Sequence, residues 1–364
     1  MNEKKVLYIA FKQPSGILVG GGMGNQRSLN TLRDYFGANN VVTEYIHTEN
    51  ERNGLFMKIK AAWMFLFDYH NGLTPRRIRE LTEQAQHFDY VFIDSSVLGI
   101  IAKALRQKDY KGKIIVHFHN IESIYYDSKM PKYLPGRGIV IRCAEHNDRY
   151  ACQYADKIIA LSQRDSSTLE KKYGRKADAI IGTGLKDVFV SADKTMMTSS
   201  RPRCLFVGAY FKPNNDGILW FVKNVLPYVN IELIIAGKNM ARLKAEQPCL
   251  KNIEVVTDVP DLRPYFESAD FMILPIFSGS GMKIKTCESL MYGKNIIGSD
   301  EAFEGYELDA DKVGGRCNTP ESFIECINHY INHPVPRFNA YSREVYLTKH
   351  SEDSTRQTFC SVFE

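Results

Sequence analysis

The sequence lacks the features of membrane-spanning, disulfide-stabilised and zinc-binding proteins. None of its apolar runs reaches the roughly 18–20 residues that a helix needs to cross a bilayer, which excludes an integral membrane protein. The eight cysteines form no C-x-x-C pair, so we expect reduced, mostly buried thiols. The N-terminus has no signal-peptide cleavage pattern. Together these absences predict a cytoplasmic protein.

Motifs of several common protein classes are also missing. The sequence contains no P-loop lysine motif and no G-x-S-x-G nucleophile elbow in a strand–turn–helix setting. It also contains no RNA-binding module or stacking-aromatic signature. These absences argue against P-loop chemistry, a serine nucleophile and a nucleic-acid partner.

The composition is that of an ordinary globular protein whose charge is unevenly distributed. Hydrophobic residues make up 44% and charged residues 24% of the 364 residues, a length that predicts two domains of about 150–200 residues each. Residues 1–195 carry 29 Lys and Arg against 21 Asp and Glu, whereas residues 196–364 carry 18 against 21. Either the first half meets something anionic, or the asymmetry is chance variation on solvated faces.

Short apolar runs alternate with helix-like stretches along the chain. This alternation predicts parallel strands with crossover helices, an α/β fold of doubly wound, Rossmann-like domains. The expected strands cover residues 6–10, 40–46, 90–94, 114–118, 157–161, 204–208, 232–236, 253–256, 271–275 and 295–298.

A polar break at residues 191–201 separates two such units. We therefore expect an N-terminal domain over residues 1–195 and a C-terminal domain over residues 198–336. The polar tail over residues 337–364 is a candidate closing helix that packs back on the first domain.

A glycine-rich segment before an expected helix over residues 26–36 is the first candidate site. Its spacing does not fit G-x-G-x-x-G, which excludes a dinucleotide-binding fingerprint. A glycine cluster before a helix still lets backbone N–H groups approach an anion, although a loop without a ligand is the alternative. The candidate residues here are Gly21, Gly22, Gly24, Asn25 and Arg27.

The second candidate site covers residues 278–293, directly after an expected strand. Small residues and hydroxyls open this loop, Lys283 and Lys285 follow, and a helix ends at the C-cap residue Gly293. Backbone N–H groups, a helix N-terminus and ammonium groups at the carboxyl end of a strand together suit a diphosphate. Glu288, one turn further on, is either a partner for ribose hydroxyls or an ordinary helix-surface glutamate.

Two single residues complete the candidates. Lys212 is the one lysine in a polar strand-to-loop turn, and taken alone it reads as a solvated side chain. His119 follows the expected strand over residues 114–118, with His117 two residues earlier on the same side. A lone histidine is more often structural than functional.

The order of these segments resembles glycosyltransferase family 4, which has the two-domain GT-B fold. The resemblance spans about residues 5–330 and is strongest over residues 204–305. The matching pieces are the glycine-rich segment, His119-Asn120-Ile121-Glu122, Val207-Gly208 with Lys212-Pro213-Asn214, Asp261-Leu262 with Tyr265-Phe266, Ala269-Asp270 before Leu274-Pro275, Gly279-Ser280-Gly281 with Lys285 and Glu288, and Glu304-Gly305.

The resemblance implies two Rossmann-like domains facing a central cleft and a retaining transfer that needs no metal or other cofactor. A nucleotide-sugar donor is then bound mainly by the second domain and an acceptor by the first. Lys212 and Lys285 match the cations that stabilise the departing diphosphate. Glu288 matches the second glutamate of the E-x7-E motif, which holds the ribose, whereas the first glutamate is replaced by Ser280.

The remaining roles follow the same resemblance. His119 is a catalytic candidate that contacts the sugar or acceptor, with Glu122 as a further candidate, and the glycine-rich segment faces the donor phosphates or the acceptor. The other expected donor contacts are Gly208, Gly279, Ser280, Gly281, Met282, Lys283 and Glu304. Asp309-Ala310-Asp311 reads as D-x-D, the metal motif of the other large glycosyltransferase fold, but it lies in a polar loop and we interpret it as chance.

The expected function is transfer of a sugar to a glycan or polyprenyl-diphosphate-linked acceptor in bacterial surface polysaccharide (capsule, O-antigen or exopolysaccharide) biosynthesis. Residues 55–67 are the most apolar stretch, with a basic run over residues 76–79 shortly after. They form either a core helix or an interfacial helix on an anionic membrane. The alternative functions are a non-catalytic nucleotide-sugar-binding partner in a glycan-assembly complex and a GT-B-like nucleotide-sugar 2-epimerase.

Overall fold

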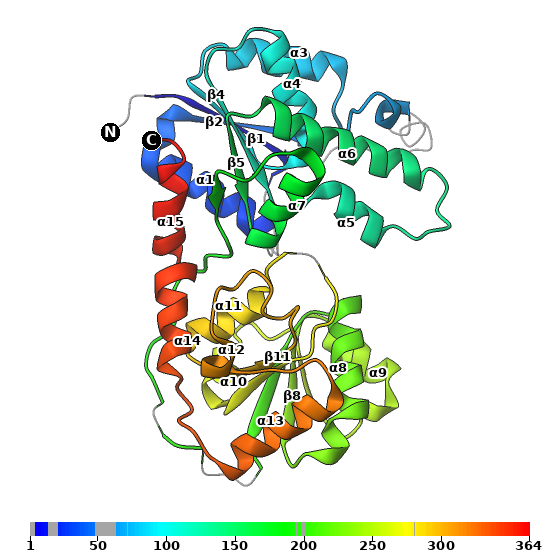
Figure 1. Ribbon diagram of the computed structural model, residues 1–364, viewed down its shortest axis with the longest axis vertical. Helices are drawn as coiled ribbons and strands as arrows, with labels where there is room; N and C mark the ends of the chain where they lie inside the picture. The colour runs from blue at the N-terminus through cyan, green and yellow to red at the C-terminus, as the bar shows by residue number, and fades with distance from the viewer. Residues whose placement is uncertain are drawn as a thin grey trace. The chain divides into compact units, whose positions relative to one another are not determined.

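The computed structural model describes residues 4–13, 21–47, 63–70, 72–193, 195–197, 201–279 and 281–364. The chain forms two compact units, Met1–Gly182 with Arg356–Glu364, and Thr183–Thr355 (Figure 1). The division therefore lies at Gly182 rather than at residue 195, and only the end of the tail belongs to the first unit. The reason is that the segment after Gly182 bonds into the second unit: the Leu185 N–H donates to the His350 carbonyl, and the Met197 N–H donates to the Val335 carbonyl.

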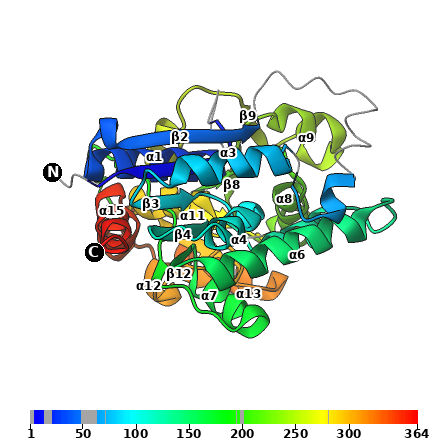
Figure 2. The ribbon, with the colours of Figure 1, turned by 90° about the horizontal axis from the view of Figure 1, so that it is seen from above.

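The first unit is built on a parallel six-stranded sheet. Its strands are β1 (Val6–Lys12), β2 (Val41–His47), β3 (Tyr90–Ile93), β4 (Lys113–Phe118), β5 (Lys157–Ala160) and β6 (Ala179–Ile180). They lie in the order β2-β1-β3-β4-β5-β6, with β2 at one edge (Figure 2). In the register of the sheet, Val6 of β1 is opposite both Val41 and Tyr90.

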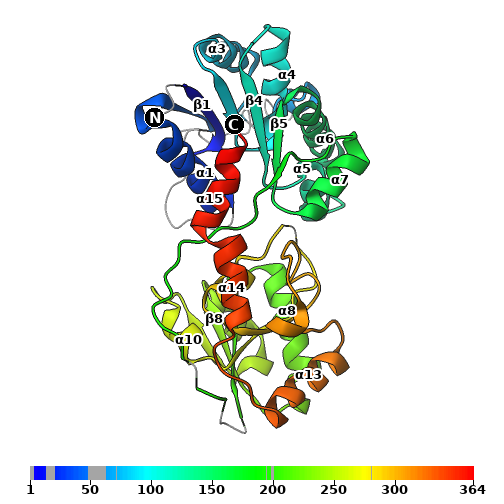
Figure 3. The ribbon, with the colours of Figure 1, turned by 60° about the vertical axis from the view of Figure 1, so that its left-hand side comes forward.

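Helices cover both faces of this sheet, because successive residues of its strands point to opposite sides. Helices α1 and α15 lie on one face of the sheet (Figure 3), where they form a core with Tyr8. Leu7 and Ile9 belong to a second core on the other face. The apolar residues of both cores are buried, and burial of apolar surface is the main stabilising term in folding. The helices include α1 (Gly21–Phe36), α3 (Pro75–Ala85), α4 (Gly99–Gln107), α5 (Glu122–Lys129), α6 (Arg137–Tyr154) and α7 (Gln163–Tyr173). Helix α15 (Glu352–Ser361) belongs to this unit from Arg356 onward.

The second unit repeats the plan with a sheet in the order β12-β11-β10-β7-β8-β9 and one continuous core. Its strands are β7 (Arg203–Val207), β8 (Glu232–Gly237), β9 (Glu254–Thr257), β10 (Phe271–Leu274), β11 (Asn295–Gly298) and β12 (Gly314–Arg316). Its helices are α8 (Lys212–Asn224), α9 (Met240–Glu246), α10 (Arg263–Ser268), α11 (Ile284–Met291), α12 (Ala310–Val313), α13 (Pro320–Asn332) and α14 (Ala340–Val345).

The expected strands are all present, so the α/β fold class is confirmed. The sequence pattern missed β6 and β12, the edge strands at one side of each sheet. Within the ranges described above, no helix is long and apolar enough to cross a membrane.

Candidate functional site

In the second unit, three elements bring polar groups together at the carboxyl edge of the sheet. Gly208 directly follows β7, Asn214 lies in the first turn of α8, and Lys285 lies in the first turn of α11. The Lys285 Nζ donates a hydrogen bond to the Asn214 Oδ1. Because parallel strands end at the same edge, segments far apart in sequence meet here, at the place where α/β sheets bind ligands. We call Gly208, Asn214, Lys285 and Glu288 the Lys285 cluster.

Gly208 packs closely against the side chains of Asn214 and Lys285. A Cβ at Gly208 would lie 2.9 Å from the Asn214 Nδ2 and 3.1 Å from the Lys285 Nζ. Any side chain here would therefore displace the amide or the ammonium. A hydrogen at this position keeps the backbone close to both polar groups.

Burial shifts both ionisable groups of the Lys285 cluster toward their neutral forms. The partly buried Lys285 ammonium lies 4.8 Å from the ring centroid of Phe206, and burial lowers its pKa to about 7. Burial likewise raises the pKa of Glu288 to about 7, although the Lys285 charge opposes this shift. An ammonium that has lost part of its hydration gains more from an anionic ligand than a solvated one does.

The loop before α11 is held by an ion pair that the sequence did not reveal. The Lys283 Nζ donates to the Gly281 carbonyl oxygen and to the Glu301 Oε1, each at 2.6 Å. Gly279 and Gly281 have φ values of 143° and 64°, a region that favours glycine. Lys283 therefore shapes this loop through internal contacts. Ser280 lies outside the described residues.

The other expected donor residues occupy different surroundings. Met282 is buried, and its Sδ accepts a hydrogen bond from the Thr183 N–H. Glu304 lies in the turn after β11, where its N–H donates to the Glu301 carbonyl. Lys212 begins α8 with an 83% exposed side chain, and its Nζ pairs with Asp216 at 2.6 Å rather than with the Lys285 cluster.

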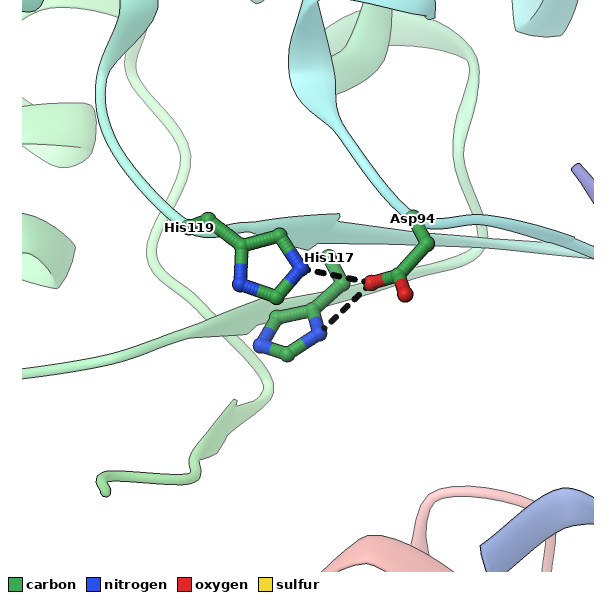
Figure 4. A group of neighbouring side chains, drawn as sticks. All are labelled: Asp94, His117 and His119. Atoms are coloured by element: carbon green, nitrogen blue, oxygen red, sulfur yellow. Dashed lines mark hydrogen bonds and ion pairs between the residues drawn. The ribbon is translucent and has the colours of Figure 1, made fainter. Parts of the chain in front are cut away.

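In the first unit, a buried carboxylate accepts hydrogen bonds from three side chains at the carboxyl edge of the sheet. Two of them, His117 and His119, are drawn in Figure 4. Asp94 directly follows β3 and has no exposed surface. Its Oδ1 accepts from the His119 Nε2 at 2.7 Å and from the His117 Nδ1 at 3.1 Å. Its Oδ2 accepts from the Tyr8 hydroxyl at 2.5 Å. We call Tyr8, Asp94, His117 and His119 the Asp94 cluster.

The Asp94 cluster combines an ionised carboxylate with a neutral imidazole. Burial opposes ionisation of Asp94, but the favourable electrostatics and hydrogen bonds of His119 and His117 outweigh it and hold the carboxyl pKa well below its usual range. Burial lowers the pKa of His117 to about 4, and the charges of His119 and Arg27 add to this shift.

The glycine-rich segment is part of a helix and not the expected loop. Helix α1 begins at Gly21, so Gly21, Gly22 and Gly24 form its first turn. A Cβ at Gly24 would lie 2.9 Å from Cε1 and 3.1 Å from Nδ1 of His119, so a glycine is needed for this close approach. The Asn25 carbonyl accepts from the Tyr8 hydroxyl at 3.2 Å, which ties the same turn to the Asp94 cluster.

Glu122 starts α5 beside a second buried carboxylate. Asp148 accepts from the backbone N–H groups of Glu122 and Ser123, at 3.3 and 2.9 Å, and from the Ser96 hydroxyl at 2.8 Å. Burial raises the pKa of Glu122 to about 8, with Asp148 adding to the shift, so Glu122 carries a proton at neutral pH. A protonated carboxyl can donate a hydrogen bond to a ligand oxygen.

Among the described residues, one group of side chains has the geometry to hold a metal ion. Asp94, His117 and His119 are the one group of three whose ligand atoms lie within 4.8 Å of one another. Asp309 of the D-x-D sequence caps α12 by accepting from the Asp311 N–H at 3.1 Å.

Sequence reasoning assigned no role to four polar residues that hold the candidate side chains of these two sites. They are Asp94, Asp148, Asn214 and Glu301, which hold His119, Glu122, Lys285 and Lys283 respectively. Asp94 and Asn214 stood next to recognised segments, one at a strand end and one in the Lys-Pro-Asn turn. Asp148 and Glu301 carried no local signal, because their partners lie 18 or more residues away.

The chain is similar to known glycosyltransferases in part of its sequence and in its fold. A family model described as Glycosyl transferases group 1 matches residues 201–333. Among solved structures, sucrose-phosphate synthase from Thermosynechococcus elongatus superposes with a TM-score of 0.72 at 12% identity, over 99% of this chain and 98% of that one. HepE from Anabaena in complex with UDP has a TM-score of 0.66 at 13% identity, over 99% of both chains.

The lipopolysaccharide outer core galactosyltransferase WaaB in its apo form also has a TM-score of 0.66 at 13% identity, again over 99% of both chains. HepE is known as well in complex with UDP-glucose. No curated protein matches the sequence. The chain therefore has the GT-B fold of glycosyltransferase structures, and its second unit carries the segment similar to Glycosyl transferases group 1.

Proposed function

We propose that the chain is a retaining, metal-independent glycosyltransferase of family 4. It moves a sugar from a nucleotide-diphosphate sugar to a glycan or polyprenyl-diphosphate-linked acceptor in surface polysaccharide assembly. The observation that carries this proposal is the Lys285 cluster, which places a partly desolvated ammonium beside Gly208 at the carboxyl edge of the second sheet. The cluster lies inside the segment that matches Glycosyl transferases group 1.

The chemistry of the leaving group explains why such a cluster is useful. When the bond between the anomeric carbon and the β-phosphate oxygen breaks, negative charge grows on the diphosphate and positive charge on the sugar ring. A cation that is already in place lowers the barrier, because it needs no reorganisation at the moment of reaction. Lys285 supplies this cation, and Gly208 lets the backbone after β7 lie close to it.

Lys212 is the second proposed cation, and little free energy is needed to separate its ammonium from its present partner. Its ammonium pairs with Asp216 on an exposed helix turn. Exposed ion pairs contribute only about 0–1 kcal/mol, so a diphosphate can take the place of Asp216. Glu288 is proposed to accept hydrogen bonds from the ribose, and Lys283 keeps the preceding loop in shape through Glu301.

The first unit is proposed to hold the groups that contact sugar and acceptor hydroxyls. His119 presents the ring edge that faces Gly24, and Glu122 presents a protonated carboxyl. Both residues lie just beyond β4, at the carboxyl edge of the first sheet.

A donor screen tests the proposal. Release of nucleoside diphosphate is measured with UDP-, GDP- and dTDP-sugars, beginning with UDP-glucose because HepE binds it. Lys285→Ala should lose most of the release, whereas Lys223→Ala, which changes an exposed lysine on α8, should keep it. Full release by Lys285→Ala would refute the role of the cluster.

The same screen separates the alternative functions. Conversion of the donor sugar without an acceptor and without diphosphate release would identify a 2-epimerase. Donor binding in calorimetry, without release on any acceptor tested, would identify a non-catalytic binding partner.

We also propose that the first unit touches an anionic membrane, where a lipid-linked acceptor resides. Trp63, Leu66 and Phe67 are exposed by 63%, 44% and 55%, unlike the side chains of a core helix. The guanidinium of Arg142 lies beside them and donates to the Leu66 carbonyl at 2.9 Å. Exposed aromatic residues next to cations suit a lipid headgroup region.

Vesicle binding tests this surface. Sedimentation with vesicles should rise with the fraction of anionic lipid, fall with salt, and decrease in a Trp63→Ser/Phe67→Ser double variant. Binding that ignores both lipid charge and salt would show that the basic excess of the first half is ordinary surface charge.

A further inference from the structure

The Asp94 cluster fixes the positions of several protons in the first unit. An ionised carboxylate only accepts hydrogen bonds, so each of its partners must carry the hydrogen. The contacts to Asp94 therefore place a proton on the Nε2 of His119 and another on the Nδ1 of His117. The Tyr8 hydroxyl donates to the other carboxylate oxygen and prevents the carboxylate from rotating freely.

The two imidazoles differ in what they leave available. His117 has no exposed surface, and within the described residues its Nε2 has no hydrogen-bond partner. The side chain of His119 keeps 11% exposure. With Nε2 turned toward Asp94, the edge of this ring that carries Nδ1 and Cε1 faces the Gly24 turn of α1. Of the two ring nitrogens of His119, Nδ1 is therefore the one that is not bonded to Asp94.

Packing restrains the His119 ring in this orientation. The ring centroids of His117 and His119 lie 4.1 Å apart with 42° between their planes (Figure 4). Gly24 approaches the edge that carries Nδ1 and Cε1, since a Cβ there would be only 2.9 Å from Cε1. A ring flip would lose the bond to Asp94 and leave a buried carboxylate short of a donor, which is costly.

We infer that Asp94 is a positioning residue: it fixes the tautomer and the ring orientation of His119, so that Nδ1 is presented as an acceptor to a substrate hydroxyl. His117 and Tyr8 complete the shell that keeps Asp94 ionised and oriented. This inference rests on the proposed function, in which His119 contacts a sugar or acceptor hydroxyl. It assigns roles to Asp94, His117 and Tyr8, none of which the sequence motifs contained.

The first test reads the tautomer directly and needs no activity. In two-dimensional NMR of 15N-histidine-labelled protein at pH 8, His119 should show a protonated Nε2 and an unprotonated Nδ1, with a His119→Gln sample for assignment. Asp94→Asn should convert this signal to a mixture or to the other tautomer, because an amide can donate as well as accept. A wild-type His119 with an unprotonated Nε2 would overturn the inference.

The second test reads the consequence for transfer. Asp94→Asn should lower kcat/KM by about 100-fold, a typical effect of a misplaced contact, while the affinity for UDP stays unchanged because UDP has no transferred sugar. Tyr8→Phe should keep the His119 tautomer and lower kcat/KM less than Asp94→Asn does. Tyr8→Phe is the variant to measure if Asp94→Asn fails to fold. Wild-type kcat/KM in Asp94→Asn would overturn the inference.

The outcomes separate this inference from the proposed function. If the wild-type protein releases no nucleoside diphosphate, the proposed function fails, but the NMR result still decides whether Asp94 fixes His119. One stoichiometric divalent metal ion in the purified protein, lost in Asp94→Asn, would overturn the positioning role, because the three side chains would then be metal ligands.

Discussion

Replacement of Lys285 by methionine should stabilise the second unit while removing donor binding. Methionine keeps most of the volume of the side chain and removes an ammonium that is partly buried beside Phe206. Burial lowers the Lys285 pKa from 10.5 to about 7. Since one pKa unit corresponds to about 1.4 kcal/mol, the folded chain loses up to about 5 kcal/mol by carrying the charged form.

The sign of the pH dependence follows from the lowered pKa. Below pH 7 Lys285 is charged in both the folded and the unfolded state, and the full penalty applies. Between pH 7 and pH 10.5 the folded state binds fewer protons, so wild-type stability rises with pH across this window. The advantage of Lys285→Met should therefore be largest at pH 6 and shrink toward pH 10.

The measured gain should be smaller than this upper limit. The variant loses the hydrogen bond to Asn214 and removes the positive charge beside Glu288. We expect a gain of about 1–3 kcal/mol at pH 6, in the range seen when buried charges are replaced by apolar groups.

Tryptophan fluorescence provides the assay. Trp220 lies in α8, where it packs against Phe277 and Phe323, so in a Trp63→Phe background the emission reports on the second unit alone. Urea unfolding at pH 6, 8 and 10 gives the free-energy difference, with Lys223→Met as the matched exposed-lysine control. A Lys285→Met variant that is less stable than wild type at pH 6, or a difference that does not change with pH, would refute the reasoning.

Three further predictions concern the same two sites. Binding of UDP-glucose at pH 8 should be accompanied by proton uptake, because the diphosphate raises the lowered pKa of Lys285. Calorimetry in buffers of different ionisation enthalpy measures the number of protons taken up, and Lys285→Arg should abolish the uptake. Gly208→Ala should weaken UDP binding by about tenfold or more, a loss of about 1.4 kcal/mol, because its Cβ meets Asn214 and Lys285; unchanged affinity in titration would contradict this. Glu122→Gln should leave the melting temperature at pH 5 nearly unchanged and flatten its pH dependence, because the raised pKa of Glu122 makes wild-type stability fall as the pH rises from 4.5 to about 8.

The regular part of the fold was predictable from short-range patterns. Runs such as those of β1 and β10 are almost entirely apolar and buried on both faces, which marks them as strands of a parallel sheet. Strand β12 has no such run, since Gly314 and Gly315 contribute no side chains, and β6 has only two residues. Edge strands of this kind form because a neighbouring strand supplies hydrogen-bond partners. The presence of that neighbour cannot be recognised from the local sequence.

The sites were predictable only as far as motifs reach. Lys285 and His119 could be selected as candidates because each lies in a segment that follows an expected strand. Their partners Asn214 and Asp94 lie 71 and 25 residues away and are chosen by tertiary packing. The glycine run was mistaken for a loop because glycine disfavours helices, whereas contact with His119 requires Gly24 inside the first turn of α1.

Diphosphate release from nucleotide sugars by wild type, Lys285→Ala and Lys223→Ala tests the central claim most directly. The proposed function predicts release with at least one donor, loss of most of it in Lys285→Ala, and wild-type rates in Lys223→Ala. Equal release by all three proteins, or binding of the donor without release on any acceptor tested, would contradict it.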